Sequence, residues 1–251
     1  MIYFKRKGVR HAYLLFAPLL VSLIPGCSSF HNQHPPQAFS AEARVLEKTL
    51  TLERDTKGIP IRYSLNYALL QWPSAPERYR FPLLLVLHGR GGSGPVYLNL
   101  WKTEAKKKHW MILAPSYENQ KFTLEDIPLL LEEVIKHYPV DQSKIYIAGM
   151  SAGGFISQML VVKDPAVWKA AVFIGAPAFP ADAPELKDLE YPPFLFVHGK
   201  KDQQFLWEEV EKSVLSLKER GVRAETFYYS DAGHEQRLEW SKTILDWLES
   251  A

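Results

Sequence analysis

One serine, one aspartate and one histidine in the second half of the chain have the types and the order that nucleophilic catalysis requires. Ser151 lies between Gly149 and Gly153 in a Gly-x-Ser-x-Gly motif, and Asp202 and then His234 follow it along the chain, far enough apart for a strand and a helix in each interval. A serine hydroxyl is a weak nucleophile until a histidine removes its proton, and that histidine needs a carboxylate to orient its ring. We therefore expect Ser151 as nucleophile, Asp202 as orienting acid and His234 as general base.

The residues around Ser151 predict the strand, tight turn and helix in which this motif is meaningful. An apolar run over 145–148 precedes the serine, and a helical pattern extends from it to about Lys163. Glycine on either side leaves room for a strained turn that lifts the hydroxyl above a sheet. The first N–H groups of the helix would face an oxyanion formed at the serine. Ala152 is therefore expected to supply one oxyanion donor.

A glycine-rich segment predicts the second oxyanion donor. The continuous apolar run 83–87 is typical of a strand buried on both faces, and His88-Gly89-Arg90-Gly91-Gly92 follows it directly. Such a loop allows close approach of the backbone, so we expect the N–H of Arg90, or of Gly91 as second choice, to complete the oxyanion hole. The same glycines could cradle a phosphate, but the Gly-Lys-Ser/Thr of a phosphate-binding loop is missing.

Two other carboxylates compete with Asp202 for the role of orienting acid. Asp231 lies close before His234, which favours a turn or cap, and Asp188 lies in a proline-rich segment. Asp202 instead follows an apolar run directly, at the strand end where open α/β sheets place their ligand crevice. His198 ends that run, and we expect it to pack or to form hydrogen bonds within the same loop.

Strand and helix patterns alternate along the chain and predict one α/β domain over residues 44–251. Apolar and polar residues alternate over 44–53 and 59–70, which indicates an antiparallel hairpin. Further strands are expected at 83–87, 110–115, 144–150, 170–175, 194–198 and 224–229, and helices at 97–109, 123–138 with Thr123 as cap, 152–163, 205–220 and 235–248. This order predicts a doubly wound, mostly parallel sheet with an N-terminal hairpin and no large lid.

The charge distribution argues against nucleic acid as a partner. The composition, 47% hydrophobic and 23% charged, is that of ordinary globular proteins, and the formal net charge is +2. Four of the 30 Lys and Arg side chains, however, lie in the segment 1–26, which contains no Asp or Glu. Subtracting these four leaves 26 positive charges against 28 negative ones, a net charge of −2. No basic footprint for nucleic acid is left.

The N-terminal segment 1–26 predicts an export signal. Basic residues precede an apolar run over 12–24 that is too short for a comfortable membrane span. The run ends in Leu-Ile-Pro-Gly-Cys27, and Cys27 is the only cysteine of the chain. This box resembles a bacterial lipoprotein signal, which implies lipidation of Cys27 and, because no acidic residue follows it, a place at the outer membrane. An ordinary secretory signal is the alternative. Residues 27–43, polar and proline-bearing, would then be a tether.

Several motifs together make residues 45–250 similar to the α/β-hydrolase family. The resemblance is to its small lidless esterases of the polyhydroxybutyrate-depolymerase-like, feruloyl-esterase-like and phospholipase/carboxylesterase types. The motifs are His88-Gly89, Val140-Asp141 leading to Gly149-Met150-Ser151-Ala152-Gly153-Gly154, His198-Gly199 with Asp202, and Gly233-His234.

Together with the N-terminal signal, this resemblance implies an exported, lipid-anchored serine esterase, and nothing in the sequence demands a metal or organic cofactor. Its substrate would be a small-molecule ester with a short acyl or aryl group, cleaved through an acyl-enzyme. Tyr117, Phe155, Phe179 and Phe205 are candidate pocket walls. A peptidase of the same fold and a catalytically idle binding protein of the cell envelope are the alternative functions.

Overall fold

Strands and helices alternate along the chain in a computed structural model, which describes residues 42–56, 59–73, 79–117, 122–178 and 190–251. The strands are β1 (Arg44–Thr56), β2 (Ile59–Gln71), β3 (Phe81–Leu87), β4 (Met111–Ser116), β5 (Val140–Met150), β6 (Ala170–Ile174), β7 (Phe194–Gly199) and β8 (Ala224–Tyr229). The helices are α1 (Gly94–Lys108), α2 (Asp126–His137), α3 (Ala152–Lys163), α4 (Trp207–Glu219) and α5 (Trp240–Ser250), with a 3-10 turn at Pro165–Val167.

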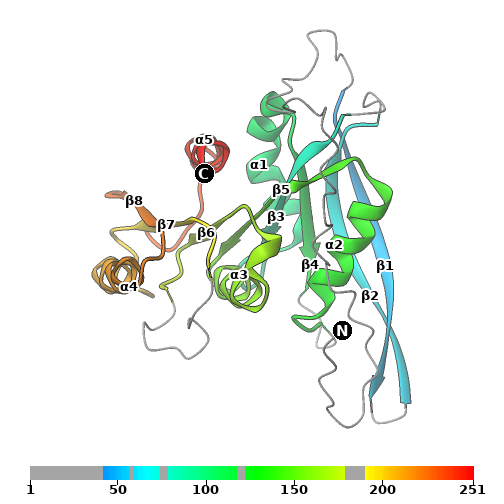
Figure 1. Ribbon diagram of the computed structural model, residues 1–251, viewed down its shortest axis with the longest axis horizontal. Helices are drawn as coiled ribbons and strands as arrows, with labels where there is room; N and C mark the ends of the chain where they lie inside the picture. Colours follow the sequence, from blue (N-terminus) through cyan, green and yellow to red (C-terminus); the bar gives the residue numbers. More distant parts are fainter. Residues whose placement is uncertain (1–41, 57–58, 74–78, 118–121, 179–189) are drawn as a thin grey trace, which may run out of the picture.

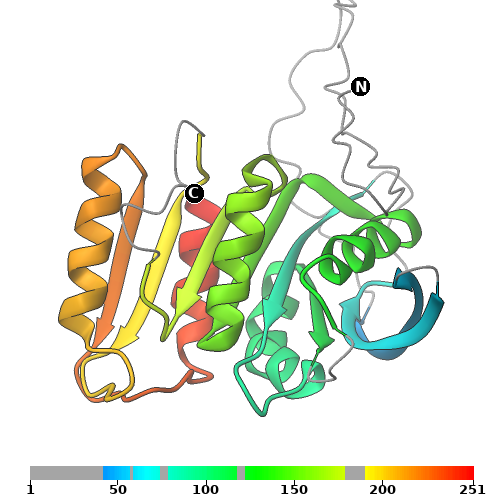
Figure 2. The same ribbon diagram turned by 90° about the horizontal axis from the view of Figure 1, so that it is seen from below.

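These strands form one eight-stranded sheet in the order β1-β2-β4-β3-β5-β6-β7-β8. The strands from β3 to β8 are parallel to their neighbours, whereas β1 pairs antiparallel with β2 and β2 pairs antiparallel with β4. Helices α1 and α5 cover one face of the sheet, and α2, α3 and α4 cover the other (Figures 1 and 2). The prediction of a doubly wound, mostly parallel α/β fold with an N-terminal hairpin is confirmed.

Helices on both faces explain why the central strands are continuous apolar runs. Every described side chain of β6 and β7 is buried, and Leu83, Leu84 and Leu85 of β3 are completely inaccessible. The two helices of one face are also joined to each other, because Lys108 of α1 pairs with Asp246 and Glu249 of α5 at 2.6 Å each.

Helix α2 begins later than the sequence predicts, at a residue that is bonded to the hairpin. Thr123 was expected to cap this helix, but Glu125 occupies that position and the prediction is wrong. The buried carboxylate of Asp126 accepts hydrogen bonds from the Tyr63 hydroxyl of β2 at 2.5 Å and from the Thr123 N–H at 2.7 Å. The Asp126 N–H in turn donates to the Thr123 carbonyl at 3.1 Å, so residues 123–126 form a turn directly before the helix.

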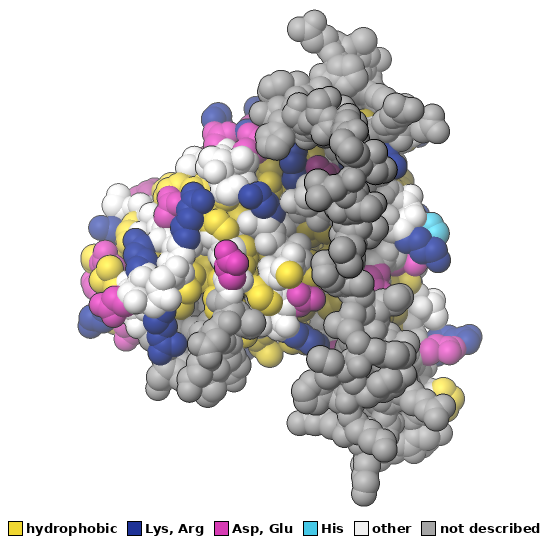
Figure 3. Space-filling view, viewed as in Figure 1, with side chains coloured by type: hydrophobic (Ala, Val, Ile, Leu, Met, Phe, Trp, Pro, Cys, Tyr) yellow, Lys and Arg dark blue, Asp and Glu magenta, His cyan; other side chains and the backbone are white. Residues whose placement is uncertain are grey.

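No helix among the described residues is long and apolar enough to cross a membrane. The predicted signal peptide, Cys27 and most of the predicted tether lie outside the described residues, as do Asp188 and Phe179. On the face drawn in Figure 3, basic and acidic side chains are interspersed over the described surface.

Candidate active site

A strained turn at Ser151 joins β5 to α3. Ser151 has φ 51° and ψ −116°, a backbone conformation that costs a residue with a side chain about 1–3 kcal/mol. Its N–H donates to the carbonyl of Ile174 in β6 at 2.8 Å, which holds the turn against the sheet. A Cβ at Gly149 would lie 2.2 Å from the carbonyl oxygen of Gly153, and one at Gly153 would lie 2.3 Å from that of Leu87. The expectation that both glycines make room for the turn is confirmed.

Three loops bring Ser151, His234 and Asp202 together at the carboxyl edge of the sheet. The Ser151 Oγ lies 2.9 Å from His234 Nε2, and His234 Nδ1 lies 2.7 Å from Asp202 Oδ2. Because a carboxylate can only accept, Nδ1 carries the proton of the neutral ring and Nε2 is free to accept from the serine hydroxyl. The Asp202 side chain is completely buried, and that of His234 is 14% exposed. The arrangement can therefore move a proton from the serine to the histidine.

The surroundings of Asp202 keep its carboxyl group ionised. Burial by itself would raise the pKa of Asp202, but hydrogen bonds from His234 and from two backbone N–H groups outweigh it and lower that pKa below its usual value. Those N–H groups belong to Gln204 and Phe205 and donate to Oδ1 at 2.8 and 3.1 Å. His198 is buried beside them, with Nε2 2.8 Å from the carbonyl oxygen of Phe205 and 3.3 Å from Asp202 Oδ2. His198 lies near the end of β7 and forms a hydrogen bond with the loop that carries Asp202, as expected from the sequence.

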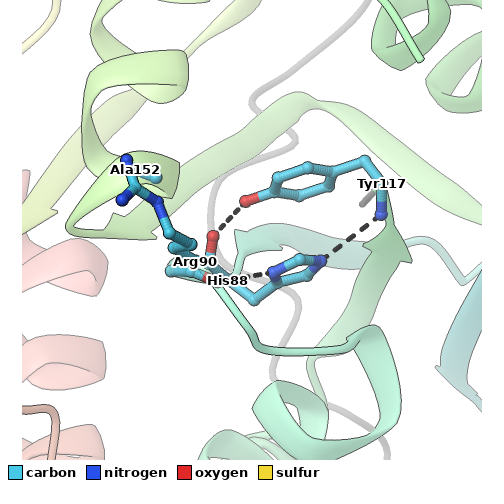
Figure 4. A pocket seen from close by; sticks show the side chains of 5 residues that line it. His88, Arg90, Tyr117 and Ala152 are labelled. Carbon is cyan, nitrogen blue, oxygen red and sulfur yellow. Dashed lines mark hydrogen bonds between the residues drawn. The ribbon is translucent and has the colours of Figure 1, made fainter. Parts of the chain in front are cut away.

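Arg90 and Ala152 line a common cavity of about 300 Å³ (Figure 4). The cavity wall also includes His88, Gly89 and Tyr117. Arg90 lies at the tip of a turn that is closed by the Gly92 N–H and the Gly89 carbonyl at 3.1 Å, with Gly91 at φ 77°. The Arg90 N–H has no acceptor among the residues that the structure describes, and the Ala152 N–H begins helix α3. Two backbone donors are thus available beside the serine turn.

His88 and Tyr117 hold this glycine-rich loop in place. The two rings stack with centroids 3.9 Å apart and planes 8° from parallel, and the Tyr117 hydroxyl donates to the His88 carbonyl. His88 Nε2 accepts from the Tyr117 N–H at 3.3 Å, so Nδ1 carries the proton that is donated to the Gly89 carbonyl at 2.8 Å (Figure 4). Both ring nitrogens of His88 are therefore occupied by hydrogen bonds to backbone groups, so the ring has a structural role.

The segment that carries His234 is held by an arginine that the sequence reasoning did not identify. Arg237 donates to Asp231 Oδ2 at 2.6 Å and to Glu235 Oε1 at 2.7 Å, so it bridges carboxylates on both sides of His234. It also lies over the ring of Trp240, the first residue of α5. Asp231, the rival acid, is exposed and pairs with Arg237.

Two further glycines make room for the site, a role that the sequence did not reveal although Gly199 belongs to one of the motifs. Gly175 has φ 56°, and a Cβ there would lie 3.3 Å from His234 Cε1. A Cβ at Gly199 would lie 2.4 Å from the carbonyl oxygens of Ala232 and Gly233. The signal that could have found them is their position, because Gly175 directly follows β6 and Gly199 ends β7.

Aromatic side chains lie along one side of His234. The ring of Phe205 is 5.7 Å from the imidazole, and Phe155 of α3 meets Phe205 edge to face at 5.6 Å. Both phenylalanines are partly exposed, whereas Tyr117 is buried and lines the cavity. No group of three or more His, Cys, Asp or Glu side chains among the described residues is placed to hold a metal ion.

A Ser–His–Asp arrangement on a doubly wound sheet defines the class of serine hydrolases with the α/β-hydrolase fold. The sequence matches the family described as the prolyl oligopeptidase family over residues 96–182 and 175–251, more than half of the chain. The chain belongs to the prolyl oligopeptidase family. This family is not one of the three esterase groups that the motifs resemble. No curated protein sequence matches the chain.

Solved structures of serine hydrolases share the fold at low sequence identity. A thermostable esterase superposes with a TM-score of 0.61 and 20% identity over 80% of this chain and 62% of its own. An S-formylglutathione hydrolase from Staphylococcus aureus gives 0.61 and 16% over 82% of this chain and 98% of its own. For a putative dipeptidyl aminopeptidase IV from Bacteroides ovatus the values are 0.64 and 16% over 82% of this chain, which spans only 36% of that protein.

Proposed function

We propose that the protein hydrolyses carboxylic esters through a covalent acyl-enzyme. The observation that carries the proposal is the hydrogen-bonded chain from Ser151 Oγ through His234 to the buried Asp202. Ser151 Oγ attacks the carbonyl carbon while His234 Nε2 takes its proton, and the N–H groups of Ala152 and Arg90 stabilise the oxyanion. The imidazolium then protonates the leaving alkoxide. Water attacks the acyl-enzyme with the same histidine as base, which releases the acid and regenerates the serine.

The family match favours a second candidate, hydrolysis of a peptide bond. The same groups can cleave an amide, because His234 can protonate a leaving amine as well as an alkoxide. Two observations support the ester. The cavity of about 300 Å³ has the size of a small-molecule site, and a structure described as an S-formylglutathione hydrolase is spanned by this chain over 98% of its length. An idle binding protein, by contrast, would not need all three residues of the triad.

A serine-directed probe and two substrates test this proposal. We expect a fluorophosphonate to label the purified protein at Ser151 and short-acyl nitrophenyl esters to be cleaved far faster than matched peptidyl nitroanilides. Ser151→Ala should abolish labelling and reduce ester turnover by several orders of magnitude, because the triad acts as a unit. Absence of labelling in the folded protein would favour the binding protein, and faster cleavage of the nitroanilides would favour the peptidase.

We also propose that the preferred esters are short-acyl or aryl esters. An enzyme of oil–water interfaces needs a large apolar surface and a cover for it, since an exposed apolar patch is a liability in water. The proline-rich segment 177–193 is instead rich in charged residues, and the cavity is small. Catalytic efficiency on a short-acyl and a long-acyl nitrophenyl ester, below and above micelle formation, is the measurement. Preference for the long chain or activation at the interface would contradict the proposal.

The proposed location is the cell envelope, with Cys27 as the lipid-modified residue of the mature chain. Each buried methylene of an acyl chain contributes about 0.8 kcal/mol, so two or more chains hold a protein firmly at a membrane. We expect Cys27→Ser to abolish membrane association in the native host. Mass spectrometry of the mature N-terminus checks the modification, and an unmodified Cys27 would contradict it.

A further inference from the structure

The guanidinium group of Arg90 lies at the candidate active site and has no partner among the described residues. The side chain is exposed and lines the same cavity as Ala152, which lies at the start of α3 (Figure 4). It forms neither an ion pair nor a side-chain hydrogen bond with any residue that the structure describes. Arg62 and Arg237, by contrast, are each paired with carboxylates. A cation thus faces the space that a bound ester would occupy.

We propose that Arg90 recognises an ionised carboxyl group of the substrate, so that the preferred esters carry a second, free carboxylate in their acyl or alkoxy part. This inference rests on the proposed ester hydrolysis and names its substrate class. A guanidinium suits a carboxylate because its planar fork can donate two parallel hydrogen bonds. Among the residues that the structure describes, no acidic side chain lines the cavity, so none of them repels a carboxylate there.

The charge of the rest of the site makes this cation decisive. Asp202 is the carboxylate of the site itself, but it is completely buried and engaged with His234. The segment 27–251 has a net charge of −2, so its overall charge does not attract anions. An anionic substrate therefore depends on a local cation, and Arg90 is the one described residue of the cavity wall with a fixed positive charge.

Two esters of nearly the same shape but different charge test the proposal. The 4-nitrophenyl monoester of glutaric acid is anionic, and its methyl ester is neutral and of nearly the same shape. The measured quantity is the ratio of kcat/KM for the anionic ester to that for the neutral ester, in the wild type, Arg90→Gln, Arg90→Glu and the control Arg220→Gln. Arg220 is an exposed arginine at the end of α4.

We expect the ratio to fall about tenfold in Arg90→Gln, the size of effect that a charge-assisted hydrogen bond gives, and to fall further in Arg90→Glu. The control should keep the ratio of the wild type. Because Arg90 is exposed, high salt should reduce the preference of the wild type for the anion. The ratio cancels any effect of the substitution on the backbone donor at the same residue, since both esters need that donor equally.

Two results would overturn the proposal. The first is a ratio that stays unchanged in Arg90→Gln while both esters lose activity equally, which would assign the side chain to general support of the oxyanion loop. The second comes from binding to the Ser151→Ala protein, which needs no turnover: equal affinity for monomethyl and dimethyl glutarate would exclude recognition of the carboxylate. Failure of the ester hypothesis looks different, because the wild type would then cleave neither nitrophenyl ester.

Discussion

Replacing Asp202 with asparagine tests the proposed mechanism most directly. The two backbone N–H groups of Gln204 and Phe205 donate to Oδ1, so an asparagine should place its amide oxygen there. Its NH₂ group would then take the place of Oδ2, 2.7 Å from His234 Nδ1. An NH₂ donor at this position forces Nδ1 to accept, so the proton moves to Nε2 and the histidine can no longer take the proton of Ser151.

The expected loss of activity follows from the cost of the opposite amide orientation. Turning the amide over restores the correct histidine tautomer, but the NH₂ group then faces two backbone donors that lose their acceptor. Each unsatisfied donor costs about 1–3 kcal/mol, so the productive orientation lies about 2–6 kcal/mol higher. We therefore expect kcat to fall by about 30-fold to 10⁴-fold.

The assay is steady-state turnover of a short-acyl nitrophenyl ester by Asp202→Asn. Near-ultraviolet circular dichroism checks that the variant is folded. Asp231→Asn is the matched control, because Asp231 is exposed and bonds to Arg237, and its loss should stay below tenfold. A folded Asp202→Asn protein that loses less than tenfold would refute the assignment of Asp202, and a larger loss in the control would transfer the role to Asp231.

Three further results are expected. Gly153→Ala should lower the free energy of unfolding by at least about 3 kcal/mol and Tm by about 6–12 °C, because its Cβ would lie 2.3 Å from a backbone oxygen. The control Gly221→Ala, with open space around its Cβ, should cost only about 1 kcal/mol, and thermal unfolding measures both variants. Arg237→Gln should lower kcat about tenfold at unchanged KM by loosening the segment around His234, and Lys242→Gln, which removes a surface pair with Asp246, should leave kcat unchanged. Folding lowers the pKa of Asp202, so its ionised form stabilises the fold at pH values above the unfolded-state pKa of about 3.9. In urea titrations, the difference in unfolding free energy between the wild type and Asp202→Asn should therefore shrink as the pH falls below about 4.

The sheet could be predicted from the sequence because each of its signals is local. The apolar run before Ser151 and the glycines on either side of it already specify a strand, a tight turn and a helix, and the structure has β5, the strained serine and α3 at those residues. The meeting of Ser151, Asp202 and His234 also follows from local signals, since each residue comes just after a predicted strand and parallel strands end at one edge.

The sequence did not show contacts between separate segments. Helix α2 begins at Asp126, whose carboxylate accepts a hydrogen bond from Tyr63 of the distant strand β2, and no pattern near Thr123 carries this contact. Helix α5 begins at Trp240, later than predicted, and Glu235 and Arg237 before it form the bridge around His234.

The choice between Arg90 and Gly91 as backbone donor likewise depends on contacts that the sequence does not show. The sequence predicts a loop of close backbone approach but leaves both N–H groups as candidates. In the structure Gly91 takes the positive φ of the turn that the Gly92 N–H closes, and the Arg90 N–H at the tip has no acceptor among the described residues, which supports the proposal of Arg90 as donor. That choice depends on where the loop is anchored, and the anchor is the stack of His88 on Tyr117 from a different strand end. The position of a loop that is held by a neighbour so distant in the sequence can be recognised only once the strands are assembled.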